Sequence, residues 1–525
     1  MSNLNSICFV GLVSVSCFIS IEASLGQRGN DNTRLGDTFG TNIHFTTGQP
    51  GETAMLSKAY RVARMDFNWG SIEKVCGTYD FSAYDALLTE METNNVRPYW
   101  ILDYSNICYP SDPWPSCSTP ACITGYGNFA NAAAIHFKGH NILWESVNEP
   151  NGMGKDNADA ISALIKAAGE PLRAAGEIWL GPTTAGIDLN YLNATFSNGV
   201  LDILSAVSVH PYRASAPEDA LNDYIALNQL LKASNHPNFN IVPGEWGYTS
   251  ATEPCVYGNK RDRVTQGKYV PRMWLTNLLA GTVLASINYD WKNDGENTTD
   301  CESNFGSVDL PYTNDPSNPF VPKPAFRAAL SIQTTIGNAA QLSNTIPVTI
   351  SSSAIAFNVS SSDVWVLEFT GGTLPQKNAY AIWSNITTCA APVETRISCA
   401  SPNANETECL SAGCCFDASS GSPSCYTTPS LSSTCPDIGP ARKDCGYLHI
   451  SKDICTSRGC CWDQNSGNNG PQCFFHEATG SFEISFPTSE SCFSTTDTFG
   501  FNRGQVCASN GIVTLNVTDG PVYLL

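Results

Sequence analysis

The chain has 525 residues, of which 42% are hydrophobic and 14% are charged, and its formal net charge is −20 at pH 7. This length exceeds one ordinary domain and the apolar content is sufficient for real cores, so we expect two or more folded domains. The acidic balance argues against nucleic acid as a partner, because the phosphate backbone would be repelled.

The chain begins with an apolar segment. Residues 7–21 are almost entirely uncharged and apolar, and the small residues Ala23 and Ser24 follow. This pattern is typical of a secretory signal peptide over residues 1–24, although no basic residue precedes the apolar run. A short membrane anchor or a buried helix is the alternative. No later stretch is long and apolar enough to span a bilayer, so we expect no membrane contact after signal removal.

Between residue 39 and about residue 294, short β-rich runs alternate with longer amphipathic stretches. The eight candidate strands cover residues 42–46, 61–67, 97–104, 142–148, 177–183, 206–212, 239–247 and 285–291. Eight β–α units of this length predict an α/β fold, a (β/α)8 TIM barrel over residues 25–330. No Gly-rich phosphate loop follows the first strand, which excludes the nucleotide-binding type of α/β fold. We therefore expect no cofactor.

After residue 330 the pattern changes to short alternating segments rich in Ser, Val and Thr, as in an antiparallel β domain. Cysteine-dense loops interrupt this pattern. The few strands on either side would make poor independent sheets. We therefore predict one antiparallel β-sandwich in two parts, residues 331–388 and 476–525, which carries the cysteine block as an insertion. Two unrelated small β modules are the alternative.

The inserted block is an internal repeat with the spacing C-x9-C-x9-C-x4-C-C in both copies, residues 389–428 and 429–475. Its cysteines are Cys389, Cys399, Cys409, Cys414, Cys415 and Cys425, then Cys435, Cys445, Cys455, Cys460, Cys461 and Cys473. Six cysteines allow 15 pairings, so the spacing leaves the connectivity open. Adjacent cysteines rarely ligate one zinc ion well, so we expect disulfides and no metal.

The repeat closely resembles the trefoil, or P-type, domain, including "GCCFD" (413–417) and "GCCWD" (459–463). Only the second copy has the Cys-Gly pair that the family shows at its second cysteine. The resemblance implies the bridges Cys389–Cys415, Cys399–Cys414, Cys409–Cys425, Cys435–Cys461, Cys445–Cys460 and Cys455–Cys473. It also implies a possible glycan contact through the trefoils. Phe416 and Trp462 either stack on sugars or pack a very small core.

Export and an oxidising compartment are indicated by the whole cysteine count. Of 22 cysteines, Cys8 and Cys17 fall in the signal, which leaves an even number of 20. Asn-x-Ser/Thr sequons for glycosylation occur at Asn193, Asn297, Asn358, Asn385, Asn405 and Asn516. We expect a secreted or extracellular protein, or one in the lumen of the secretory–lysosomal route.

Two glutamates end candidate barrel strands. Glu149 ends the fourth strand and Glu245 the seventh, and catalytic residues of TIM barrels lie at the carboxyl ends of strands. Two carboxylates on one rim suit glycoside hydrolysis, in which one protonates the leaving oxygen and the other attacks or activates water. A lone glutamate at such a place is usually a solvated loop charge, so the interpretation depends on the neighbouring residues.

Those neighbours are polar or aromatic and also lie at strand ends. They are Arg64 and Asp66 on strand two, Asn148 beside Glu149, His210 and Tyr212 on strand six, Trp246 beside Glu245, and Trp291 on strand eight. An arginine and a tyrosine would keep a nucleophilic glutamate ionised, and tryptophans offer flat faces to sugars. Glu145 lies on the same strand face as Glu149. We predict that it points into the barrel and pairs with Arg61 or Arg64 as structural support.

These segments resemble retaining glycoside hydrolases of clan A, of family 39 or the cellulase-like family 5 type. The resemblance rests on "ESVNEPNG" (145–152), "SVHPYR" (208–213), "GEWGY" (244–248) and "RVARMDFNWGSIEK" (61–74), and it covers residues 39–525 apart from the insertion. It implies that Glu149 is the acid/base and Glu245 the nucleophile. It also implies that Arg64, His210, Tyr212 and Trp291 shape the substrate-binding site. We add Asn148 and Trp246 to that site because each lies beside one of the two glutamates.

The implied reaction is a double displacement at a β-glycosidic bond of a poly- or oligosaccharide. Glu149 must start protonated, so we expect burial and the charge of Glu245 to raise its pKa. Glucan, xylan, galactan and uronic-acid polymers all stay open as substrates. A non-catalytic, lectin-like carbohydrate-binding protein and an extracellular coat protein are the alternative functions.

The remaining cysteines are expected to brace loops. Cys76, Cys108, Cys117, Cys122, Cys255 and Cys301 follow candidate strands two, three, seven and eight. We predict the bridge Cys255–Cys301 between adjacent loops, and Cys492–Cys507 in the closing β segments. The pairing of the other four is open.

Overall fold

The computed structural model describes residues 34–109, 117–153, 157–253, 255, 259–282, 284–310, 320–350, 361–385, 482–517 and 519–525. Within the cysteine block it describes residues 397–398, 415–416, 425–427, 452, 461–462 and 473–474. The expected signal peptide, Asn358, Asn405 and the proposed trefoil bridges lie outside this part of the chain. Within it, no helix is both long and apolar enough to cross a membrane.

Eight parallel strands form the barrel. They are β1 (Phe39–Asn42), β2 (Val62–Asn68), β3 (Arg97–Asp103), β4 (Leu143–Glu145), β5 (Ile178–Leu180), β7 (Val207–His210), β8 (Ile241–Pro243) and β9 (Ser286–Asn288). One sheet has the order β5-β4-β3-β2-β1-β9, and a second joins β7 and β8 to the short strand β6 (Thr184–Ala185). Parallel bridges Leu180–Ala206 and Trp246–Asn288 connect the two sheets and close the ring. The predicted barrel is therefore present.

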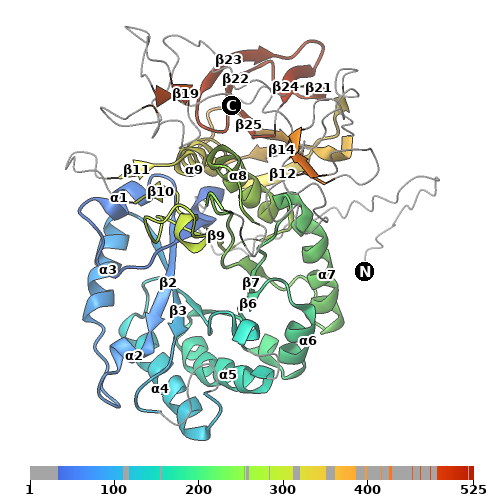
Figure 1. The fold of residues 1–525 in the computed structure, drawn as a ribbon. Coiled ribbons are helices and arrows are strands. Elements are labelled where there is room, and N and C mark those ends of the chain that lie inside the picture. Colours follow the sequence, from blue (N-terminus) through green and yellow to red (C-terminus); the bar gives the residue numbers. More distant parts are fainter. Residues whose placement is uncertain are drawn as a thin grey trace.

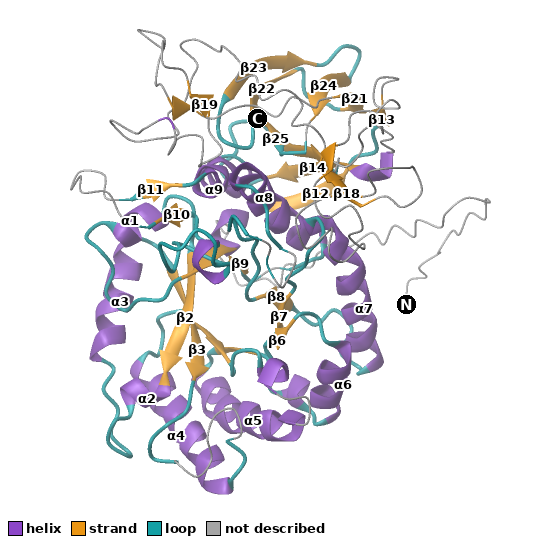
Figure 2. Cartoon of the chain, viewed as in Figure 1, coloured by secondary structure: helices purple, strands orange, loops and turns teal. Residues whose placement is uncertain are grey.

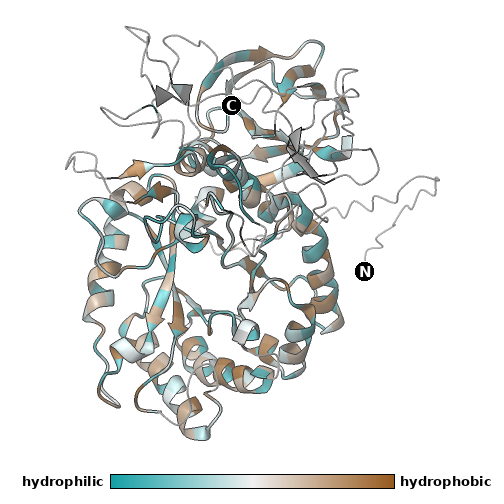
Figure 3. Cartoon of the chain, viewed as in Figure 1, coloured by the Kyte–Doolittle hydropathy of each residue, from teal (hydrophilic) through white to brown (hydrophobic). Residues whose placement is uncertain are grey.

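The helices lie outside this ring (Figures 1 and 2). They are α1 (Glu52–Leu56), α2 (Trp69–Ile72), α3 (Ser82–Thr93), α4 (Pro120–His136), α5 (Ala158–Ala175), α6 (Leu189–Ser197), α7 (Ala220–Ala233), α8 (Arg263–Leu279) and α9 (Pro324–Thr334). In α5, Ile161, Ile165 and Leu172 are buried at helical spacing, and Gly176 ends the helix with φ +81°. Figure 3 shows polar and apolar residues on the same helices, as expected for helices that cover a sheet.

The first strand differs from its prediction. It was expected at residues 42–46, and the structure has it at Phe39–Asn42. Its partners decide the position, because Gly40 pairs with Val62 on β2 and with Ile287 on β9. A side chain at Gly40 would collide with Val62, so this position on the strand suits only glycine. The shift moves Asn42 from the start of the strand to its carboxyl end, on the rim.

Two antiparallel sheets follow the barrel. One has the order β12-β14-β15-β25-β22-β23 and the other β13-β21-β24. Their strands are β12 (Gln341–Thr345), β13 (Thr349–Ile350), β14 (Val364–Thr370), β15 (Asn378–Ser384), β21 (Phe482–Pro487), β22 (Cys492–Thr496), β23 (Asn502–Cys507), β24 (Ile512–Val517) and β25 (Val522–Leu524). Buried side chains of both sheets form one core. Strands from either side of the cysteine block are hydrogen-bonded neighbours, β15 with β25 and β13 with β21.

A buried ion pair joins these sheets to the barrel. Arg272 of α8 donates two hydrogen bonds to Glu218, at 2.8 and 2.6 Å, and both side chains are almost fully buried. Trp383 of β15 donates its indole N–H to the same carboxylate at 2.7 Å. Each Glu218 oxygen is thus held by hydrogen-bond donors, which a buried charge requires. The β domain is therefore fixed against α8, as Figure 1 shows.

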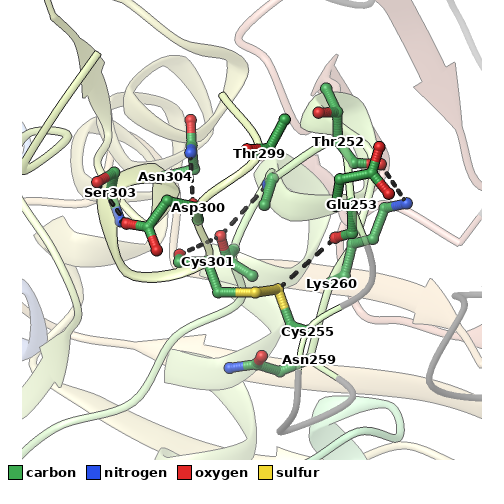
Figure 4. Close-up of a disulfide and its surroundings, with 12 residues drawn as sticks. Thr252, Glu253, Cys255, Asn259, Lys260, Thr299, Asp300, Cys301, Ser303 and Asn304 are labelled. Atoms are coloured by element: carbon green, nitrogen blue, oxygen red, sulfur yellow. Dashed lines mark hydrogen bonds between the residues drawn. A yellow bond between two sulfur atoms is a disulfide. The ribbon is translucent and has the colours of Figure 1, made fainter. Parts of the chain in front are cut away.

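Four disulfides lie in the described residues: Cys76–Cys108, Cys117–Cys122, Cys255–Cys301 and Cys492–Cys507. Both predicted pairs are confirmed, and the structure decides the other two. Cys255–Cys301 connects the loop after β8 with the loop after β9 (Figure 4). Thr249 adds a hydrogen bond of 2.7 Å to the Cys301 carbonyl. The loops that follow barrel strands seven and eight are therefore linked covalently at the rim.

Candidate active site

Arg64 is the organising cation of the barrel interior. It lies in the middle of β2 rather than at its end, its side chain is 1% exposed, and it contacts three other strands or loops. Its guanidinium donates to Glu145 Oε2 through Nε, to Glu245 Oε2 through Nη1 and to Asn148 Oδ1 through Nη2, each at 2.8 Å. A planar guanidinium has enough fixed donors to hold three acceptors at once. It thereby sets the positions of Asn148 and Glu245.

Glu145 is the structural partner of Arg64. It is fully buried on β4 and also accepts hydrogen bonds from the Tyr99 hydroxyl at 2.5 Å and from the Ser208 hydroxyl. The prediction that Glu145 points inward and pairs with an arginine is confirmed, and Arg64 is that arginine. Because its two oxygens already accept hydrogen bonds from Arg64, Tyr99 and Ser208 inside the barrel, Glu145 is not available to a substrate.

Glu245 lies directly after β8 and is surrounded by donors. Its Oε1 accepts the Tyr212 hydroxyl at 2.7 Å, and its Oε2 accepts Arg64 at 2.8 Å and the Asn42 amide at 3.3 Å. The side chain is 13% exposed, so it faces the rim through a narrow opening. These three donors fix the orientation of the Glu245 carboxyl group. The predicted neighbourhood of Glu245 with Arg64 and Tyr212 is therefore present.

Glu149 faces Glu245 across His210. His210 is fully buried at the end of β7, and its Nδ1 lies 2.7 Å from Glu149 Oε1 and 3.8 Å from Glu245 Oε2. Ligand-type atoms of these three residues all lie within 4.8 Å of one another. Glu149 is more open than Glu245, with 31% of its side chain exposed, and its backbone has φ +45°, an uncommon value for a residue other than glycine. Such backbone strain is concentrated at functional sites.

The tautomer of His210 follows from Arg64. The His210 Nε2 lies 3.3 Å from Arg64 Nη2, and an arginine only donates, so Nε2 acts as the acceptor. The proton of the neutral ring is then on Nδ1, which donates to Glu149. This contact stabilises the Glu149 carboxylate.

The expectation of a raised pKa for Glu149 was wrong. Burial is the largest influence and does raise it, but the hydrogen bond from His210 and the charge of Arg64 lower the pKa below its usual value. The expectation rested on Glu245 and burial alone. His210, 61 residues away, reverses the direction.

Asp103 is a site residue that sequence reasoning missed. It ends β3, is fully buried, and both its oxygens lie 3.3 Å from the Asn148 backbone N–H, which holds the segment before Glu149. Burial, followed by the charge of Asp66, raises the pKa of Asp103 well above its usual value. Its position at the carboxyl end of a barrel strand could have identified Asp103 as a candidate site residue from the sequence. Asn42 was missed for a different reason: its strand was predicted at residues 42–46, which placed Asn42 at the start of the strand and not at its carboxyl end.

The comparisons with known proteins fit this geometry. A family 39 glycoside hydrolase from the gut symbiont Bacteroides cellulosilyticus WH2 superposes with a TM-score of 0.61 at 16% identity, over 94% of this chain and 82% of that one. The family 39 enzyme from Xanthomonas axonopodis pv. citri gives 0.53 at 12%, over 94% of each chain. A family 30 endoxylanase from Clostridium papyrosolvens C71 gives 0.50 at 11%, over 94% and 97%. The chain has the fold of clan A glycoside hydrolases.

The family model of the trefoil (P-type) domain matches residues 389–428 and 435–476. The chain thus contains two trefoil domains. The described pieces of these domains are short antiparallel pairs, such as β17 (Cys415–Phe416) with β18 (Cys425–Thr427) and β19 (Cys461–Trp462) with β20 (Cys473–Phe474). Among curated protein sequences, none matches the chain.

Trp246 and Trp291 were expected to bind sugars, but both side chains are fully buried. Trp291 donates its indole N–H to Glu52 at 2.9 Å and packs against Phe326. The Trp246 ring lies beneath the Arg213 guanidinium, 5.7 Å from it. Neither ring shows a free face, so a stacking role would require neighbouring side chains to move. The roles of both stay predictions.

A metal is not required to explain the three groups at the centre of the site. Glu149, His210 and Glu245 are close enough to share one ion. However, the Glu245 oxygens already accept from Arg64, Tyr212 and Asn42, and His210 Nδ1 already pairs with Glu149. The described contacts thus form a hydrogen-bonded ion network. That arrangement suits acid–base and nucleophilic chemistry.

Proposed function

We propose that the protein is a secreted retaining glycoside hydrolase that cleaves β-glycosidic bonds in a poly- or oligosaccharide. The observation that carries the proposal is the pair of carboxylates on one rim, with oxygens of Glu149 and Glu245 within 4.8 Å. Retaining enzymes hold their carboxyl groups about 5–5.5 Å apart, whereas inverting enzymes leave about 6.5–9.5 Å for a water. The closest oxygens of the two groups thus lie nearer to each other than the spacing of an inverting pair, which supports retention.

The two glutamates then have different roles. Glu245, oriented by Arg64 and Tyr212, attacks the anomeric carbon while Glu149 protonates the departing oxygen. Glu149 next removes a proton from water, which releases the sugar from Glu245 with retained configuration. Asn148, fixed by Arg64 and Asp103, presents its amide to a hydroxyl of the bound sugar.

Secretion is supported by the covalent bridges. The described residues hold four disulfides, and the trefoil family is cysteine-rich, so the chain suits an oxidising compartment. The sequons at Asn193, Asn297 and Asn516 are exposed, as glycosylation requires, and Asn385 is half-buried with its Oδ1 bonded to Arg272. We propose an extracellular or secretory–lysosomal location.

We also propose that the two antiparallel sheets are one β-sandwich into which the trefoils are inserted. The pairing of β15 with β25 across the cysteine block and the core shared by both sheets support this arrangement.

Release of reducing sugar from a panel of β-linked polysaccharides tests the function. We expect the wild type to release sugar from at least one of them and Glu245→Gln to release none, because an amide is not a nucleophile. Binding of a polysaccharide without any release by the wild type would instead support the lectin-like alternative.

The lowered pKa of Glu149 predicts an acidic pH optimum. Glu149 must be protonated to act, so kcat/KM should fall as the pH rises through its pKa in the free enzyme. In His210→Phe the stabilisation of the carboxylate is lost while burial remains, so the pKa rises and the alkaline limb of the profile moves to higher pH. Tyr212→Phe is the control, because that hydroxyl contacts Glu245, and its alkaline limb should stay in place. An unmoved limb in His210→Phe would contradict the assignment of the acid.

A further inference from the structure

His44 lies between two carboxylates near the rim, and two further carboxylates, Asp66 and Glu302, are within reach of its charge. His44 Nε2 lies 3.6 Å from Asp290 Oδ2 and 4.0 Å from Asp294 Oδ1. Burial raises the pKa of Asp66, Asp290, Asp294 and Glu302, and the charge of His44 lowers that of Asp66, Asp294 and Glu302. The negative charge of Glu245 further raises the pKa of Asp66, Asp290 and Glu302. Geometry connects Glu245 with these groups as well: Tyr289, whose hydroxyl donates to Glu302, packs edge-on against Tyr212, whose hydroxyl donates to Glu245. We call Asp66, Asp290, Asp294 and Glu302 the acidic cluster.

The acidic cluster reaches from the interior to solvent. Asp290 comes two residues after β9 and is 1% exposed, whereas His44, Asp294 and Glu302 are exposed. The bridge Cys255–Cys301 holds the residue next to Glu302 against the loop after β8 (Figure 4). The Glu302 carboxylate accepts the Tyr289 hydroxyl at 2.5 Å. A ligand that approaches from the rim therefore meets His44, Asp294 and Glu302, with Asp290 buried beneath them, and the loops that carry these residues are braced.

Asp290 points to a ligand. Neither of its carboxyl oxygens accepts a hydrogen bond in the part of the chain that the structure describes, although both are buried, and His44 Nε2 is beyond hydrogen-bond distance at 3.6 Å. Burial raises the pKa of Asp290 well above its usual value, and the charge of the buried Lys323 lowers it in part. A buried carboxyl group whose oxygens have no hydrogen-bond partner is costly to the folded protein. Hydroxyl or ammonium groups of a bound molecule would remove that cost by donating to it.

The nearby positive charges within the described residues are occupied by other partners. Arg64 holds Glu145 and Glu245, and Lys292 lies 3.0 Å from Glu52. Lys323 is buried and donates to Asn293 and to the Asn304 carbonyl. The carboxylate of an acidic sugar would thus meet four carboxylates and one histidine that is already paired with two of them.

We propose that the acidic cluster is a sugar-binding subsite that accepts rings bearing only hydroxyl or ammonium groups and rejects rings bearing a carboxylate, sulfate or phosphate. The inference rests on the proposed function and narrows its substrate class. Uronic-acid polymers are excluded, and neutral or amino-sugar glycans stay as substrates. The selection is electrostatic, since donors satisfy Asp290 while a second anion is repelled.

The test compares three aryl β-glycosides: that of the neutral sugar released in the polysaccharide panel, its uronic acid and its amino-sugar counterpart. We expect the wild type to prefer the neutral sugar over the uronic acid by about 100-fold in kcat/KM, with the amino sugar accepted. Asp294→Asn combined with Glu302→Gln should reduce this ratio by about tenfold, because two repelling charges are gone. High salt should reduce it in the wild type as well.

Glu253→Gln is the matched control, because Glu253 is exposed on the neighbouring loop outside the acidic cluster and its removal changes the net charge by one. The ratio should be unchanged in this variant. Equal hydrolysis of the uronic acid and the neutral sugar by the wild type would overturn the inference while leaving the proposed function intact.

A binding measurement keeps the two proposals separate. Calorimetry of Glu149→Gln with the three free sugars should show binding of the neutral and amino sugars and no detectable binding of the uronic acid. If no glycoside is hydrolysed, this result still supports the subsite, and tight binding of the uronic acid refutes it. A final experiment titrates the EDTA-treated protein with Ca²⁺ or Zn²⁺ to test whether the acidic cluster binds a cation. A cation bound by the cluster that admits the uronic acid would refute the proposal too.

Discussion

Glu245→Ala is expected to lower kcat/KM by a factor on the order of 10⁴ or more, because the reaction loses its nucleophile. The fold should survive, since Arg64 keeps its contacts with Glu145 and Asn148 after the carboxylate is removed. An aryl glycoside of the sugar identified in the polysaccharide panel is the substrate for this measurement. Circular dichroism and the melting temperature check that the variant is folded.

Azide distinguishes the nucleophile from any other essential residue. In Glu245→Ala the small anion can occupy the space of the carboxylate and attack the anomeric carbon from the same side. This single displacement inverts the configuration, so the expected product is the α-glycosyl azide, identified by its anomeric NMR coupling. Glu296→Ala, an exposed glutamate on the loop after β9, is the control and should retain full activity. A β-glycosyl azide from Glu245→Ala would contradict the assignment.

Glu149→Ala is expected to have the second largest effect, a loss of about 10²–10⁴ in kcat for substrates with poor leaving groups. Without the acid, the departing oxygen leaves as an anion, so an activated aryl glycoside should still form the glycosyl-enzyme on Glu245. Water then attacks slowly because the general base is missing. The role of the acid is tested by measuring kcat for a series of aryl glycosides whose leaving groups differ in pKa. The kcat of Glu149→Ala should fall with increasing leaving-group pKa far more steeply than that of the wild type.

Azide is expected to give a product of opposite anomeric configuration in Glu149→Ala compared with Glu245→Ala. In Glu149→Ala the glycosyl-enzyme forms normally on Glu245, and azide attacks from the side that Glu149 vacated. Two displacements restore the starting configuration, so the expected product is the β-glycosyl azide. If Glu149→Ala hydrolysed poor leaving groups at the wild-type rate, Glu149 would not be the acid. Glu145→Gln should not show this azide product, because Glu145 is buried against Arg64, Tyr99 and Ser208.

The barrel and the inward position of Glu145 were predictable from local patterns. Strand and helix periodicities alternate eight times, and the alternation of side chains along β4 puts Glu145 inside. The bridge Cys255–Cys301 followed from loops that adjacent strands bring together. The first strand was misplaced because residues 39–42 and 42–46 are both compatible with a strand. Only the close approach of β2 and β9 to Gly40 selects between them.

The protonation state of the acid could not be predicted. It depends on the 2.7 Å contact between His210 on β7 and Glu149 in the loop after β4, and on the Arg64 donor that assigns the His210 tautomer. Similarly, no local pattern brings His44 and Asp290, near opposite ends of the barrel sequence, to 3.6 Å. The missed residues Asn42 and Asp103 also act through contacts between strands.

The sequence by itself therefore determined the order of the elements, the two trefoil domains and the positions of the two rim glutamates. Periodicity, cysteine spacing and strand ends are local properties of the sequence, and they do not depend on which residues meet in the tertiary structure. Only the tertiary structure decided which charges meet, and with them the lowered pKa of Glu149 and the acidic cluster beside Glu245. Electrostatic energies depend on distances of a few ångströms between side chains, and closing the barrel creates those distances.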